Sequence, residues 1–169
     1  AGGTQLPPLR EGFVSLPGRV TSIVLAPKHL HKALRLISSE HKDWKAINYE
    51  LGSAYFALTT FENDYSRKIT FLRRVISYLD QAVGYNEKER PSLLEGAMLD
   101  LEMVELDDLV GKSFEHRALG ETEKAIECLT KAAEAAQVSS DLSHRESTIY
   151  MYLGETYIEQ ENFSEATYA

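Results

Sequence analysis

Apolar residues recur at three- and four-residue spacing along most of this chain, and short polar, glycine or proline breaks separate one such run from the next. This spacing places the apolar side chains on one face of an α-helix. No run is apolar on every face, so each predicted helix has to bury its apolar stripe against a neighbouring helix. The pattern therefore predicts an all-α fold of successive packed helices.

The first 27 residues have a different composition. They hold four of the chain's five prolines and four of its ten glycines, and this content predicts a non-helical N-terminal arm over residues 1–27. Within the arm, the β-branched segment 19–25 is compatible with a strand or with an extended arm packed on the helices.

Residues 28–169 are predicted to form a helical domain. Its expected helices cover residues 28–39, 43–60, 66–83, 91–119, 121–138 and 143–160. The fourth is much longer than the ~11-residue average helix, so it either bridges neighbouring units or contains a break at Gly96 or Gly111. The chain is expected to end in the first turns of a seventh helix.

Composition narrows the class of protein. The net charge is −8, with +4 over residues 1–45 and −12 over residues 46–169. An acidic body argues against nucleic-acid binding, because affinity for phosphates comes mainly from clustered Lys and Arg. The single cysteine, Cys128, allows no internal disulfide. No apolar run approaches a membrane span and no signal peptide is recognisable, so we expect an intracellular protein, cytoplasmic or nuclear.

Motifs for catalysis, cofactors or metals are not found in the sequence, and we expect none of these sites and no enzyme. His29 and His31 have the wrong spacing for two zinc ligands on one helix, and solvated surface histidines are expected instead. Six carboxylates between Glu95 and Asp108 favour a solvated acidic face or a patch for a basic partner, because the histidine ligands of di-iron bundles are missing. The basic pairs at 67–68 and 73–74 are expected to balance that acidic surface.

Three segments share a motif. Near the end of the chain, Tyr150-x-x-Leu153-Gly154-x-x-Tyr157 is followed by Phe163-x-x-Ala166. Leu51-Gly52-x-x-Tyr55 and Val110-Gly111-x-x-Phe114 are further copies, with second helices expected over 75–82 and 125–132. This pattern resembles the tetratricopeptide repeat (TPR), a 34-residue helix pair in which glycine allows close helix approach.

The resemblance implies that helix pairs stack into a short right-handed superhelix, an α-solenoid, and that the chain is a fragment of a longer one. It also implies a non-catalytic interaction scaffold, whose groove binds a peptide or helix of a partner protein. Plain inter-helix packing is the other interpretation of each groove residue, and an internal structural segment of a large multiprotein complex is the alternative function. The partner-binding residues implied by position are Tyr49, Ser53, Phe56, Asp108, Lys112, Glu115, Met151, Glu155 and Ile158.

Overall fold

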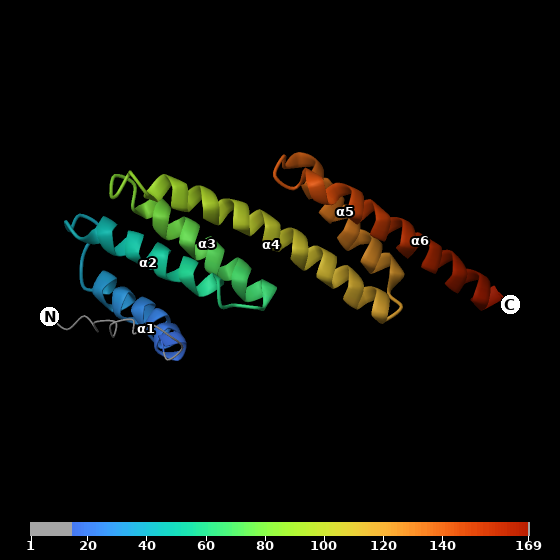
Figure 1. Cartoon of the computed structure of the whole chain (residues 1–169), viewed down its shortest axis with the longest axis horizontal. Helices are drawn as coiled ribbons and strands as arrows, with labels where there is room; N and C mark the ends of the chain where they lie inside the picture. The colour runs from blue at the N-terminus through green and yellow to red at the C-terminus, as the bar shows by residue number, and fades with distance from the viewer. Residues whose placement is uncertain (1–14, 169) are drawn as a thin grey trace. The chain divides into compact units, whose positions relative to one another are not determined.

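The chain is helical over the range that the computed structural model describes, which is the backbone of residues 15–168 and the side chains of residues 24–162. The predicted all-α class is therefore confirmed. Figure 1 shows the elements in order: α1 (Ser15–Arg35), α2 (Trp44–Thr59), α3 (Tyr65–Gln81), α4 (Arg90–Ala118), α5 (Thr122–Val138), a 3-10 turn (Ser143–Arg145) and α6 (Glu146–Tyr168).

The chain divides into two compact units, and the boundary falls inside α4, after Met98. The first unit contains α1, α2, α3 and the beginning of α4. The second contains the rest of α4 with α5 and α6. Because α4 is continuous, the break considered at Gly96 or Gly111 does not occur, and one helix contributes residues to both units.

In the first unit, α2 and α3 form an antiparallel helix pair, and α1 packs against α2. A short loop joins α2 to α3, and the Asp64 carboxylate caps α3 by accepting a hydrogen bond from the Arg67 backbone N–H at 2.9 Å. The buried apolar side chains of the pair are Tyr49, Leu51 and Tyr55 from α2, and Leu72, Val75 and Leu79 from α3.

At Gly52 the two helices pack closely. A Cβ atom at this position would lie 2.8 Å from Cδ2 and 2.9 Å from Cγ of Leu79, which is fully buried. Carbon atoms in good contact lie about 3.5–4.0 Å apart, so any larger residue here would require the Leu79 side chain to shift. The glycine of the first Leu-Gly-x-x-Tyr copy therefore has the packing role that the motif predicts.

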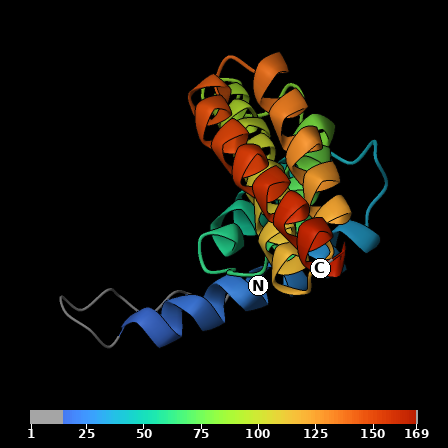
Figure 2. The ribbon, with the colours of Figure 1, turned by 90° about the vertical axis from the view of Figure 1, so that its right-hand side faces the viewer.

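The second unit is built around a cluster of small and branched side chains. Figure 2 shows α5 and α6 lying side by side. The buried members of the cluster are Leu106 and Val110 from α4, Leu129, Ala132, Ala133 and Ala136 from α5, Leu142 from the turn, and Ile149 from α6. The turn between α4 and α5 passes through Gly120, whose φ of +75° is a left-handed conformation that glycine adopts without strain.

The predicted arm over residues 1–27 is wrong for residues 15–27, which form the first turns of α1. The possible strand at 19–25 is therefore also wrong, and residues 1–14 lie outside the described range. Pro27 is buried inside α1. An interior proline removes one helix hydrogen bond and costs about 3 kcal/mol, so it weakens a helix locally without always ending it.

The end of the chain also differs from the prediction. A seventh helix was expected to begin after a break near Gln160, but α6 runs without interruption from Glu146 to Tyr168. The third motif copy is therefore one long helix over the described residues, and its expected second half, around Phe163 and Ala166, continues the first. The segment 160–164 contains neither glycine nor proline, so no residue there forces the backbone out of the helical conformation.

Among the helices of residues 15–168, none combines the length and the apolar character needed to cross a lipid bilayer.

Gly52→Ala tests the close approach of α2 and α3. We expect the substitution to lower the free energy of unfolding by about 1–3 kcal/mol, the usual cost of overpacking a core. Urea denaturation measures this change. The matched control is Gly154→Ala in the last copy of the same motif, because nothing lies within 4 Å of its would-be Cβ. There we expect a gain of up to about 1 kcal/mol from helix propensity. Equal effects at the two glycines would contradict the close-approach role of Gly52.

Candidate functional site

The residues implied for the first copy, Tyr49, Ser53 and Phe56, lie on one face of α2, and two of them line a pocket. This pocket has a volume of about 450 Å³. Its walls come from α2, from the turn before α4 and from the first turns of α4, and we call it the aromatic pocket. Its lining residues are Tyr49, Phe56, Lys88, Glu89, Ser92, Leu93 and Gly96.

Tyr49 forms part of the wall of this pocket, and most of its side chain is already packed against the protein. Its side chain is 9% exposed, its ring lies 5.5 Å from the ring of Tyr85, and its hydroxyl donates a hydrogen bond to Glu89 at 3.3 Å. Burial raises the pKa of the Tyr49 hydroxyl, and the Glu89 carboxylate acts in the same direction. Phe56 is only partly buried, so of the two rings it is the one that a ligand in the pocket could contact.

The turn before α4 is held by one ion pair. Arg90 donates two hydrogen bonds to Glu87, at 2.8 and 3.0 Å, and a third to the backbone carbonyl of Leu79 at 3.3 Å. Glu87 also accepts the backbone N–H of Gly84. These bonds, first of all those from Arg90, lower the pKa of Glu87 to about 2. The pair fixes the turn that carries Lys88 and Glu89 to the pocket rim.

The residues implied for the middle copy lie on the second-unit part of α4. Asp108 and Lys112, one helical turn apart, form an ion pair of 2.7 Å, and this pair raises the pKa of Lys112. Glu115 is exposed. The Lys112 side chain is half exposed and that of Asp108 is only partly exposed, and a surface ion pair of this kind contributes little to stability.

The residues implied for the last copy are all exposed on α6. Met151 is 54% exposed and Ile158 61%, while Glu155 lies 3.6 Å from Arg117 of α4. Tyr150 and Tyr157 are also about half exposed. A continuous apolar face therefore runs along α6 through Tyr150, Met151, Gly154, Tyr157 and Ile158, and we call it the α6 stripe.

Tyr150, Tyr157 and Ile158 stand at the three- and four-residue spacing that is typical of a buried stripe, but the structure leaves all three exposed. The side that faces the core carries Ile149, which is fully buried, and Leu153, which is partly buried against the same cluster. An apolar stripe wider than one neighbour can cover looks the same in a sequence as a fully buried one.

An aromatic and ionic contact that the sequence did not reveal fixes α6 to α4. Arg117 forms a paired hydrogen bond with the Glu159 carboxylate, at 3.1 and 2.5 Å. The Arg117 guanidinium also lies 5.6 Å above the Phe114 ring, which packs edge-on against Tyr152 at 4.9 Å. No local pattern could have indicated this contact, because its partners lie far apart in the sequence. It holds α6 in place while the α6 stripe stays exposed.

The histidines differ from the prediction at one position. His29 is exposed, as expected, but His31 is partly buried and lies 2.7 Å from the Tyr55 hydroxyl. Within the described part of the chain, no group of three or more metal-ligand side chains comes together. Of the basic stripe on α3, Arg67 pairs with Glu62 at 3.2 Å, whereas Arg74 turns toward Tyr55.

The chain matches no protein-family model, no curated protein and no solved structure. Its function has to be argued from the geometry of these surfaces.

Stability at low pH tests the turn at the pocket rim. The pKa of Glu87 is lowered from 4.5 to about 2 in the folded protein. The contribution of its ionised carboxylate to the free energy of unfolding is therefore complete above pH 4.5 and is lost as the pH falls toward 2. We expect an NMR titration to give a Glu87 carboxyl pKa near 2. Glu87→Gln should flatten the stability profile over that range, whereas exposed Glu134→Gln should not. A Glu87 carboxyl pKa near 4.5 would contradict the ion pair with Arg90.

Proposed function

We propose that this protein is a non-catalytic interaction scaffold that holds a helix or peptide of a partner protein. The observation that carries the proposal is the α6 stripe. Four large apolar side chains, Tyr150, Met151, Tyr157 and Ile158, share one helix face and are 47–61% exposed.

Such a face is unusual for a surface that only meets water. Single exposed apolar residues are common, but a contiguous apolar patch marks a binding surface. Tyrosine and methionine are also the residue types enriched in the cores of protein interfaces. The stripe therefore favours a protein partner whose own apolar side chains would cover it.

The glycine at the centre of the stripe indicates which secondary structure a partner segment would have. In α2, the glycine of the same Leu-Gly-x-x-Tyr motif receives Leu79 of the antiparallel helix α3. In α6, Gly154 has open space in the same place. A helix that presents a leucine toward Gly154 would fit between Tyr150 and Tyr157 as α3 fits on α2. A helical partner is thus favoured over an extended peptide at this surface.

The TPR resemblance extends the same proposal. The close packing of α2 and α3 at Gly52 supports assigning the pair as one repeat, and stacking of such pairs would give the expected superhelix. The aromatic pocket then serves as a contact point on the first unit, and the charged pair Asp108–Lys112 serves separately as one on the second unit.

A second candidate function uses the same observation. The α6 stripe could be the seam of an internal segment in a large multiprotein complex, covered permanently by a neighbouring subunit. Permanent interfaces are larger and more apolar than those of modular binders, so the two functions differ in how the protein behaves without its partner.

Substitutions in the stripe test the scaffold function. The probe is a display library of amphipathic helical peptides with leucine on one face. We expect selected peptides to bind the unmodified protein and to lose at least tenfold in affinity for Ile158→Asp or Tyr157→Asp, because binding would bury a charge. Val138→Asp, at an 89% exposed apolar position on α5, is the matched control and should bind normally. If no peptide is selected, or if all three variants lose affinity equally, the stripe is not the binding face.

Light scattering distinguishes the two candidate functions. For a modular binder, we expect a stable monomer over a wide concentration range, since the stripe is small enough to tolerate water. Aggregation of the unmodified protein that Ile158→Asp suppresses would instead favour the internal segment of an assembly.

A further inference from the structure

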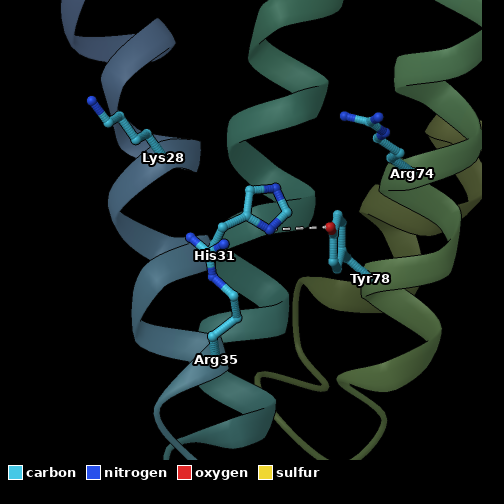
Figure 3. A pocket seen from close by; sticks show the side chains of 5 residues that line it. All are labelled: Lys28, His31, Arg35, Arg74 and Tyr78. Atoms are coloured by element: carbon cyan, nitrogen blue, oxygen red, sulfur yellow. Dashed lines mark hydrogen bonds between the residues drawn. The ribbon is translucent and has the colours of Figure 1, made fainter.

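A second pocket in the first unit has a very different lining. It has a volume of about 500 Å³ and lies between α1 and α3. Figure 3 shows its lining residues, Lys28, His31, Arg35, Arg74 and Tyr78, and the hydrogen bond that joins His31 to Tyr78. Three are cations and one is a histidine, so we call this pocket the basic basin.

Two stacked tyrosines, Tyr55 and Tyr78, hold side chains of the basin in position. The rings of Tyr55 and Tyr78 are stacked at 5.7 Å, and His31 packs edge-on against both. Arg74 lies 5.4 Å above the Tyr55 ring and donates a hydrogen bond to the Tyr55 hydroxyl at 3.1 Å. That hydroxyl can then donate its proton to Nε2 of a neutral His31, 2.7 Å away. The positions of His31 and Arg74 are therefore set by packing and not by a carboxylate.

The cations of the basin have no close counter-charge among the side chains of residues 24–162. Among the described side chains, no carboxylate lies within 4.0 Å of the charged groups of Lys28, Arg35 or Arg74. This is notable in a chain with 26 acidic and 18 basic residues, where Arg67, Arg90, Arg117 and Arg145 all pair with carboxylates. Burial, and then the charges of Arg74 and Arg35, lower the pKa of His31. The basin thus gathers three cations with which no carboxylate of residues 24–162 forms an ion pair.

We propose that the basic basin binds a phosphorylated side chain of a protein partner, with Arg35, Arg74 and Lys28 contacting the phosphoryl oxygens. Guanidinium groups suit this role because their forked donors match phosphate oxygens in pairs. A phosphoryl dianion also neutralises several clustered cations better than a single carboxylate does.

The lining favours a phosphoryl group on a protein over a free small molecule. Small-molecule pockets are mostly apolar and enclose their ligand, whereas this basin is open, and three of its five lining residues are cations. Clusters of arginine are the usual means of recognising phosphorylated protein segments. This inference rests on the proposed interaction function, since it supplies a second contact for the same kind of partner.

The test compares three degenerate nine-residue peptide libraries that differ only at the central residue, which is phosphoserine, serine or glutamate. We expect the phosphoserine library to bind the full chain at least tenfold more tightly than either other library, measured by fluorescence anisotropy. In an NMR titration, the bound dianion should raise the pKa of His31 by favouring its charged form. The groups facing that imidazole are Lys28 and Arg35 on α1, Tyr55 on α2, and Arg74 and Tyr78 on α3.

Arg35→Gln and Lys28→Gln are the informative variants, because both side chains are exposed and their loss leaves the tyrosine pair intact. Each should weaken phosphopeptide binding about tenfold. Lys32→Gln removes the same charge from an exposed position on the same helix that does not line the basin, and it should change affinity less than twofold.

Several outcomes would overturn the assignment. Equal losses for Lys32→Gln and Arg35→Gln would mean diffuse electrostatic attraction only. Binding of inorganic phosphate as tight as that of the peptides, or binding only to vesicles that contain a phosphorylated lipid, would mean a ligand that is not a protein. The proposal fails separately from the scaffold function at α6, because Ile158→Asp should leave phosphopeptide binding unchanged and Arg35→Gln should leave selection on the α6 stripe unchanged.

Discussion

The contact of Gly52 with Leu79 determines the layout of the first unit. The buried Leu79 side chain occupies the space that any larger residue at position 52 would need, and the side chains flanking the glycine on α2 then point to either side of the seam. Tyr55 reaches one side, where it stacks on Tyr78 and holds His31 of α1. Phe56 and Tyr49 reach the other side and line the aromatic pocket. The two pockets of this unit therefore depend on one close helix–helix approach.

Much of this fold could be read from the sequence because the helices follow local rules. The spacing of apolar residues predicted α2, α3 and α5 to within a few residues, and Gly120 marked the end of α4. The errors lie where a local rule has a tolerated exception. Pro27 stands inside α1, and the segment around Phe163 continues α6 although a repeat was expected to turn there. A proline in the first place and a repeat motif in the second favour an end of the helix, but neither is sufficient to end it.

The surfaces were less predictable than the helices. Positional analogy put Tyr49 and Phe56 on a shared face, and they do line one pocket, because residues seven apart on a helix always share a face. It could not reveal the basic basin, whose side chains come from α1 and α3 and meet only after both helices pack beside Tyr55. It also missed Arg117, whose carboxylate partner lies on α6. Charges far apart in sequence acquire a role only when packing brings them together.

The two Leu-Gly-x-x-Tyr segments show that one sequence pattern can form a helix face that is covered or one that stays open. The pattern specifies a helix face with a shallow gap at glycine between apolar side chains. Wherever this face occurs, burying it under another helix removes apolar surface from water. Around Gly52 the chain supplies that helix itself, as α3. Around Gly154 the face remains open, although Arg117 and the buried Ile149 hold the rest of α6 in place. A helix face that is already held in place loses little conformational entropy on association, so the contacts that fix α6 would lower the entropic cost of covering the stripe in the proposed interaction.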